Sequence, residues 1–388
     1  MLGVIPVIVV ALPFVSAAVL AMVASWRIAI WFNAGSASLQ FVVAFALAWQ
    51  VPTAATHLAV LTAFVAMTTS WFGRRDIAVS LAARSLNRQR IRRYHVGYQA
   101  LIGAIQAAAL ADDLIVTWIA LVVAFAASAA VTGAARGAAA AAGASRLVQH
   151  CAIGLLLALL GTLLLDLAPG AAGVFLLLGY GTVAGLVPLH SWQPNTAAEG
   201  VPPGAIVVAV LANVPLMLFM RLHIVPELLI GFGLVSLLPC AVALFARLDR
   251  RRTVALAGMA QLGMVVFAIG LGAKQVAWLH MTLLTLARST VLQSQGEDTI
   301  AWLALALMPL YALYLLASPT VAVDPWLLVP LAASVLLTVS ALLGRCPGGM
   351  RAYPVAATPI WLQLVLVMLL GFAMPSQVAA WFSEVAAG

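Results

Sequence analysis

Long apolar runs recur from one end of this chain to the other, separated by short polar segments or by segments rich in proline and glycine. The runs are about 18 to 25 residues long, and a helix of that length crosses the ~30 Å hydrocarbon core of a bilayer. The pattern predicts an all-α, polytopic membrane bundle of about fourteen transmembrane helices. They centre on residues 3–23, 28–50, 55–72, 94–112, 114–132, 149–167, 172–190, 203–221, 225–246, 253–271, 275–293, 299–317, 325–343 and 356–383.

The composition agrees with this interpretation and excludes a soluble protein. Of the 388 residues, 65% are hydrophobic and only 8% are charged, which is too few charges to cover the surface of a soluble domain. No linker or polar domain interrupts the pattern, so residues 1–388 are expected to form one integral membrane domain. No basic residue precedes the first run and no small-residue cleavage site follows it, so we expect a retained first span and no signal peptide.

Basic residues alternate between the predicted loops, and this explains the formal charge of +8 without a nucleic-acid partner. Nearly all of them fall in odd-numbered loops, with Arg221 and Lys274 as the exceptions. The positive-inside rule then places the odd loops in the cytoplasm and both termini on the other side of the inner membrane. The arginines of the 74–93 loop are expected to meet anionic lipid headgroups or a partner subunit. The odd-loop arginines are Arg27, Arg74, Arg75, Arg84, Arg88, Arg90, Arg92, Arg93, Arg136, Arg146, Arg247, Arg250, Arg251, Arg252, Arg345 and Arg351.

Motifs for metal, cofactor or covalent chemistry are missing from the sequence. The three cysteines lie far apart, without the spacing of a disulfide-exchange pair or an iron–sulfur site, and the six histidines are scattered. No phosphate-binding loop, dinucleotide fingerprint or Ser/His/Asp constellation is present. We therefore expect no bound metal and no cofactor.

Two further expectations concern local structure. The stretch AAVTGAARGAAAAAGAS at 129–145 is interpreted as a weakly helical connector between two spans. Trp192, Trp278 and Trp302 are interpreted as anchors at the membrane–water interface, where amphipathic rings are enriched.

The most polar interruption of the apolar pattern is GLVPLHSWQPNTAAEGVPPG at 185–204. His190 lies beside Pro188, where it could pass a proton or hydrogen-bond backbone groups that the proline break leaves free. Glu199 could take part in a proton path, or it could cap the N–H groups of the following helix, where negative charge is favourable. The sequence favours the structural role for both residues and leaves the other open.

Three stretches together resemble the antiporter-like membrane subunits of respiratory complex I, Mrp cation/proton antiporters and formate-hydrogenlyase-type hydrogenases. The break at 185–204 is similar to the family pattern P-[LM]-H-x-W-x-P-x-A-x-x-E-x-P, and RRTVALAGMAQLGMVVFAIGLG and LHMTLLTLARSTVLQSQG resemble two later family helices. The resemblance covers about residues 85–300 in the family's order and fits the hydrogenase branch best. It implies two inverted five-helix repeats with broken helices at the core.

The resemblance also implies a row of groups that exchange protons at mid-membrane depth, and this chain departs from that row. The family's glutamate falls on Val122 and its paired lysine on Val183, and valine cannot carry a proton. A histidine of some members falls on Gln261, another on Leu284, and a lysine falls on Arg288. Arginine is in effect never deprotonated in proteins, so Arg288 cannot act as a relay.

The remaining candidates for a proton path are His190, Glu199, Gln261, His280 and Arg288. His280 and Arg288 are eight residues apart, so they share a face of their helix, where they could line an ion path or lock the helix to a neighbour.

Three functions are compatible with this sequence. The first is a membrane subunit that anchors or scaffolds a complex related to complex I or membrane-bound hydrogenases, with its proton translocation impaired or lost. Its partners would be other membrane subunits, peripheral redox subunits and lipids. The alternative is a proton- or sodium-coupling transporter subunit, for example of an inorganic-carbon uptake complex with a zinc-containing subunit. The third, a stand-alone cation/proton antiporter, conflicts with the lost ion pair.

Overall fold

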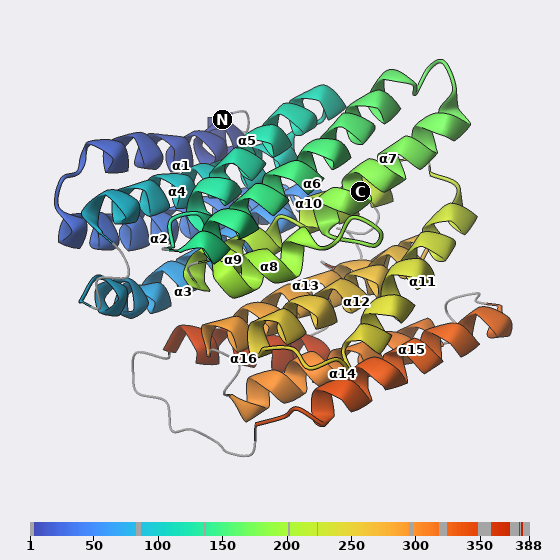
Figure 1. Cartoon of the computed structure of the whole chain (residues 1–388). Coiled ribbons are helices and arrows are strands. Elements are labelled where there is room, and N and C mark those ends of the chain that lie inside the picture. The colour runs from blue at the N-terminus through green and yellow to red at the C-terminus, as the bar shows by residue number, and fades with distance from the viewer. Residues whose placement is uncertain are drawn as a thin grey trace.

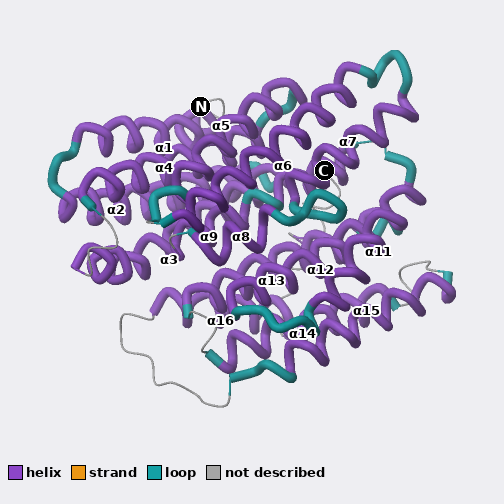
Figure 2. Tube along the Cα trace, viewed as in Figure 1, coloured by secondary structure: helices purple, strands orange, loops and turns teal. Residues whose placement is uncertain are grey.

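A computed structural model describes residues 4–82, 87–135, 137–200, 202–222, 224–294, 298–317, 324–347 and 358–372, together with residues 380 and 382. All regular secondary structure in these ranges is helical (Figure 2). Nine of the described helices are long and apolar enough to cross a membrane. The helices are α1 (Val4–Met22), α2 (Trp26–Gln50), α3 (Ala54–Ala82), α4 (Arg88–Leu110), α5 (Leu114–Thr132), α6 (Ala138–Leu163), α7 (Pro169–Ala184), α8 (Trp192–Glu199), α9 (Pro202–Val210), α10 (Asn213–Arg221), α11 (Pro226–Ala243), α12 (Arg250–Gly270), α13 (Lys274–Gln293), α14 (Thr299–Leu316), α15 (Pro325–Leu343) and α16 (Thr358–Phe372).

The long helices run side by side as a bundle, with the N-terminal helices on one side and α14, α15 and α16 on the other (Figure 1). Two helices form its centre. The apolar stretch of α12 that is long enough to span the membrane is wholly buried, and α13 is buried from Ala277 to Gln293. The outer helices expose large apolar side chains such as Val7 and Leu156, as expected where a helix faces lipid. The predicted all-α bundle is therefore confirmed, and its core is the region around α12 and α13.

The predicted seventh span ends earlier than the apolar pattern suggested. We predicted a helix over 172–190, but α7 ends at Ala184 because Gly185 adopts a left-handed conformation with φ of 77°. The N–H of Leu186 then bonds to the carbonyl of Gly181 at 2.8 Å, which closes the helix end. The polar segment that follows forms the short helix α8, which the sequence did not predict.

The predicted span over 203–221 is two helices, α9 and α10, separated at Leu211 and Ala212. Pro215 has no N–H to donate to the carbonyl of Leu211, so an uninterrupted helix cannot form across this point. The expected broken helices are thus present.

Two other predictions of local structure need correction or limits. The stretch 129–145 is not a connector, because α5 continues to Thr132 and α6 already begins at Ala138. Alanine has the highest helix propensity, so this segment extends α6. The last predicted span, 356–383, is described only as α16 and residues 380 and 382. Arg84, Arg136 and Arg351 also lie outside the described residues.

Basic residues from separate loops meet at one end of the bundle. Arg90, at the start of α4, donates to the carbonyls of Ala134 and Ala135 after α5. Arg252 at the start of α12 contacts Glu199 at the end of α8, and Arg345 after α15 donates to the carbonyl of Ala246 after α11. The alternation seen in the sequence therefore corresponds to one arginine-rich end of the folded chain.

Candidate functional site: a buried polar row along α13

The break after α7 is closed by side chains of α8. The indole N–H of Trp192 donates to the carbonyl of Thr182 at 2.9 Å, and the amide of Gln193 donates to the carbonyl of Ala184 at 3.1 Å. These carbonyls belong to the last turn of α7, where no intrahelical partner is available. The polar motif therefore satisfies a helix end that would otherwise be unpaired in a buried place.

The prediction that three tryptophans anchor the chain at the interface is wrong. Trp192, Trp278 and Trp302 are each 1% exposed or less. The indole of Trp302 donates to the carbonyl of Leu342 at 2.7 Å, as that of Trp192 does to Thr182. A buried indole is stable when its N–H has such a partner, so these rings are core residues.

His190 and Glu199, the two motif residues proposed for a proton path, lie at the rim of the break. His190 is partly exposed, and its Nδ1 lies 3.1 Å from the carbonyl oxygen of Pro188, to which it can donate. The carboxylate of Glu199 accepts a hydrogen bond from Nη2 of Arg252 at 2.8 Å. A cleft of about 230 Å³ beside this pair is also lined by Arg146 and Asn195. Glu199 thus joins the motif to the arginine-rich end.

Seven polar side chains follow one another along α13 inside the bundle, and we call them the α13 row. Each is 8% exposed or less. At 1.5 Å per residue the row extends over about 20 Å, which is most of the hydrocarbon thickness. Its members are His280, Thr282, Thr285, Arg288, Ser289, Thr290 and Gln293.

Side chains from α3 and α16 bind the two ends of the α13 row. At one end, Nε2 of His57 lies 2.9 Å from the hydroxyl of Thr282. At the other end, Oε1 of Gln363 accepts from Ser289 at 2.6 Å, while its amide nitrogen donates to the hydroxyl of Thr68 at 2.6 Å. These partners were not predicted, because the apolar pattern does not show which polar side chain of a span faces the bundle interior.

Arg288 connects the middle of the α13 row to the motif. Its side chain is buried, and Nη2 donates to Oε1 of Gln193 at 3.2 Å. Gln193 is itself held by its bond to Ala184, so its oxygen is fixed toward Arg288. The guanidinium passes directly over Gly258, where a methyl group would lie 2.8 Å from its central carbon. The position of this cation is thus fixed by its own helix α13, by Gly258 on α12 and by Gln193 after the break.

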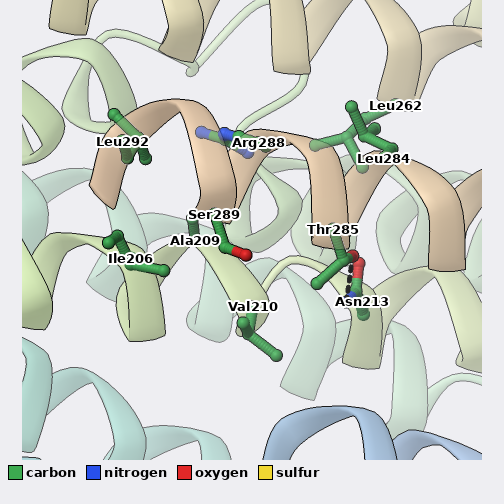
Figure 3. A pocket seen from close by; sticks show the side chains of 10 residues that line it. All are labelled: Ile206, Ala209, Val210, Asn213, Leu262, Leu284, Thr285, Arg288, Ser289 and Leu292. Atoms are coloured by element: carbon green, nitrogen blue, oxygen red, sulfur yellow. Dashed lines mark hydrogen bonds between the residues drawn. The ribbon is translucent and has the colours of Figure 1, made fainter. Parts of the chain in front are cut away.

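A small cavity adjoins Arg288, with a volume of about 10 Å³, which is room for roughly one water molecule. Figure 3 shows its wall, where the amide of Asn213 donates to the hydroxyl of Thr285 at 2.9 Å and the hydroxyl of Ser289 projects from the same helix. Asn213 begins α10 directly after the break between α9 and α10. Its role was not predicted, although an asparagine two residues before a proline in an apolar run was a usable signal.

In the described part of the chain, the two other candidates on α12 and α13 form no hydrogen bond to this centre. His280 is buried, and neither of its ring nitrogens has a hydrogen-bond partner in the described part of the chain. Gln261 is buried too, and its amide donates to the carbonyl of Leu305 on α14 at 3.0 Å. The α13 row is therefore polar throughout but not joined by one unbroken chain of hydrogen bonds.

The three positions at which the resemblance implies lost ionisable residues differ in their surroundings. Val183 is fully buried at the end of α7, and Leu284 is buried and lines the cavity beside Arg288. Val122 is 39% exposed on the outer face of α5, whereas the neighbouring Leu121 is fully buried. Of these two adjacent positions, Leu121 faces the interior, and it is equally unable to carry a proton.

A second set of buried polar side chains lies in the N-terminal half and was not predicted. The amide of Gln40 donates to Oε1 of Gln99 at 2.6 Å, and Gln99 donates to Oδ1 of Asn33 at 2.9 Å. On the same helix as Gln99, His95 and Gln106 are buried without a hydrogen-bond partner among the described residues. The spacing of Gln99 and Gln106, seven residues on α4, was the available signal.

No metal site is formed by the described residues, since no three His, Cys, Asp or Glu side chains gather in them. Every described acidic residue between 88 and 372 lies at a helix end or in a connection. Among the described residues of this region, Arg288 is a buried cation within a helix, and Asp298 is a buried carboxylate that caps the start of α14.

Comparison with known proteins agrees with this architecture. A model of the NADH:quinone oxidoreductase/Mrp antiporter transmembrane family matches residues 146–297, which include the break, α12 and α13. A hydrogenase-4 component F homolog of Methylacidiphilum infernorum is 26% identical over 339 residues, covering 74% of this chain and 71% of that protein. Over these residues the chain is similar to antiporter-like membrane subunits.

Solved structures show the same fold as this chain at low sequence identity. A chain of the Mrp complex from Dietzia sp. DQ12-45-1b superposes with a TM-score of 0.80 at 12% identity, covering 100% of this chain and 97% of that one. A chain of respiratory complex I from Thermus thermophilus gives 0.79 at 17% identity, covering 97% and 98%. A chain of the archaeal membrane-bound sulfane sulfur reductase gives 0.79 at 14% identity, covering 98% and 97%.

Proposed function

We propose that this antiporter-like subunit anchors and scaffolds a multisubunit membrane complex related to complex I or membrane-bound hydrogenases, and that its own proton translocation is impaired or lost. The observation that carries the proposal is the lack of a carboxylate, histidine or lysine on α5 and α7, the helices on which the resemblance places the paired glutamate and lysine. Neither α5 nor α7 contains an acidic or basic residue, and Val183 and Leu121 are fully buried. A proton path along α5 and α7 would therefore find no carboxylate, histidine or lysine on either helix to bind the proton.

The second half supports the same conclusion, because its central charge is an arginine. A relay residue must both take up and release a proton, which carboxylates, histidine and desolvated lysine can do. Arg288 holds its proton at every physiological pH, so it provides a fixed charge at the point where a relay would need exchange. His280 and His57 could exchange protons near one end of the α13 row, and the fixed cation separates that end from Glu199.

The partners we propose are other membrane subunits and a peripheral redox subunit, with lipids around the outer helices. Arg74, Arg92 and Arg93 belong to the arginine-rich end, which we propose faces the cytoplasm in the inner membrane. Both termini would then lie on the opposite side.

Purification of the native complex in mild detergent, followed by identification of the associated chains, tests the scaffold role. Co-purification of hydrogenase or dehydrogenase subunits supports it. An isolated chain that exchanges protons or sodium in liposomes would overturn it.

Restoring the lost pair tests why translocation is impaired. In liposomes containing the purified complex, Leu121→Glu with Val183→Lys is expected to raise proton uptake above that of the unmodified complex. The matched control is Val122→Glu with Val183→Lys, since Val122 is 39% exposed on the outer face of α5. Equal uptake by both double variants would contradict the assignment of the interior position.

A second function, proton or sodium coupling in a transporter such as an inorganic-carbon uptake complex, draws support from the continuous burial of the α13 row. It would require His280, Arg288, His190 and Glu199 to act together with water between them. Co-purification of a zinc-containing subunit, combined with ion flux that falls at least roughly tenfold in His280→Phe, would favour this function. Unchanged flux in that variant would count against it.

A further inference from the structure

We propose that the cavity beside Arg288 binds one small monovalent anion, of the size of chloride, as the counter-charge of the buried guanidinium. This inference concerns the α13 row alone and does not depend on whether the subunit moves protons.

The first argument is charge balance. Arg288 is 4% exposed, and its described polar partner is the neutral oxygen of Gln193. Ion pairs in the described part of the chain involve Arg221 and Arg252, and none involves Arg288. A buried charge without an opposite charge is costly, and charged groups inside membrane proteins are normally paired. The folded chain therefore leaves a positive charge that a ligand can neutralise.

The second argument is that the fold holds this cation in place. Gln193 is fixed by its bond to the carbonyl of Ala184, and Gly258 gives the guanidinium room that any side chain would occupy. The Nε–H of Arg288 has no hydrogen-bond partner among the described residues. A fixed guanidinium with an unused donor is the arrangement expected of an anion site.

The third argument is the adjoining space. The cavity has a volume of about 10 Å³, and its wall combines Arg288, Asn213, Thr285 and Ser289 with apolar side chains. Asn213 uses one amide hydrogen on Thr285, and the amide has a second. A cavity of this size has room for a single water-sized particle. A monatomic anion comes nearest to this size, whereas bicarbonate and phosphate are larger.

The test uses the complex purified in mild detergent and exchanged into sodium gluconate. Its thermal unfolding midpoint is then measured as gluconate is replaced by chloride or bromide at constant ionic strength. A ligand that binds only the folded state raises the midpoint with a saturable dependence on its concentration. We expect chloride and bromide to stabilise the complex and gluconate, which exceeds the cavity, to have no specific effect.

Two arginine variants separate this site from general salt effects. Arg288→Gln is expected to lose the saturable halide response or to weaken it by at least roughly tenfold, because hydrogen bonds to a charged group are lost. Arg221→Gln removes an exposed arginine that pairs with Asp112, and it should keep the response of the unmodified complex. An identical halide response in both variants would overturn the proposal.

A third variant guards against misfolding of Arg288→Gln. Ala209→Val adds two carbon atoms to the cavity wall while Arg288 stays in place, so it should also weaken the halide response. For the unmodified complex, about one radioactive chloride ion per chain should remain bound and be displaced by bromide. Absence of such binding, together with equal midpoints in chloride and gluconate, would show that the cavity holds only water and would refute the anion site.

Discussion

The contact between α11 and α12 offers a sharp test of the packing that positions the α13 row. At this crossing, a methyl group on Gly233 would lie 2.7 Å from the backbone nitrogen of Phe267 and 2.7 Å from the carbonyl oxygen of Gly263. Both neighbours are backbone atoms, so no side-chain rotation can relieve the overlap. Gly233→Ala must therefore move α11 away from α12, the helix that also carries Gly258 and Gln261.

The expected cost of Gly233→Ala is about 2–3 kcal/mol of unfolding free energy. Inserting a methyl group into a packed site typically costs about 1–3 kcal/mol, and the immobile backbone places this site at the upper end. Small residues at such crossings allow helices in a membrane to approach closely.

The matched control is Gly231→Ala, two residues away on the same helix. A methyl group at Gly231 would meet nothing within 4 Å, and the residue is exposed. Alanine is a better helix former than glycine, so this variant should gain up to about 1 kcal/mol.

The assay is the fraction of protein that stays monodisperse in detergent after heating over a series of temperatures. Gly233→Ala should lose half its monodisperse fraction at a clearly lower temperature than the unmodified chain, and Gly231→Ala at the same or a higher temperature. If Gly233→Ala is as stable as Gly231→Ala, then α11 and α12 do not approach as closely at Gly233 as described above.

Three further predictions concern the motif and the arginine-rich end. Trp192→Phe removes the hydrogen bond to the carbonyl of Thr182 and should lower the unfolding free energy by about 1–3 kcal/mol, because a buried acceptor is left unpaired. If the temperature at which half the monodisperse fraction is lost does not change, Trp192 does not stabilise the end of α7. Arg252→Gln breaks the ion pair with Glu199. The side chain of Arg252 is 36% exposed and that of Glu199 is 27% exposed, so the loss of unfolding free energy should be about 1 kcal/mol or less and should shrink in high salt. Burial raises the pKa of the Cys346 thiol, so labelling by a membrane-impermeant maleimide should be slow at neutral pH and faster as the pH rises. That labelling should occur from the cytoplasmic face, and labelling of intact cells from outside would reverse the proposed orientation.

The sequence by itself determined the class of the fold and the location of the break. Apolar runs long enough to span a bilayer left no alternative to a membrane bundle, because so few charges cannot solvate a chain of this length. The sorting of arginines between loops likewise anticipated the arginine-rich end. These features depend on composition and local order along the chain, which is why they can be read without the structure.

Local errors arose where burial, rather than composition, decided the outcome. Tryptophan is typical of interfacial anchors. The indole N–H groups of Trp192 and Trp302, however, donate to carbonyls at helix ends inside the core. The alanine-rich stretch before residue 145 looked like a connector because hydropathy is weak there, and yet it begins α6.

Only the tertiary structure decided how the polar residues are used. It placed Val122 on the outer face of α5 and Leu121 in the interior. The resemblance to the family motif could not distinguish these two adjacent positions. It also brought Gln193 to Arg288, ninety-five positions away in the sequence. Asn213, which follows the break between α9 and α10, was brought to Thr285 on α13. Such contacts depend on how helices cross in space, and a chain made mostly of apolar side chains has many crossings that satisfy the same hydrophobic pattern. Close-packed glycines and a few buried hydrogen bonds select one of them. That selection placed Arg288, a buried cation without an ion-pair partner in the described part of the chain, beside a cavity the size of one water molecule.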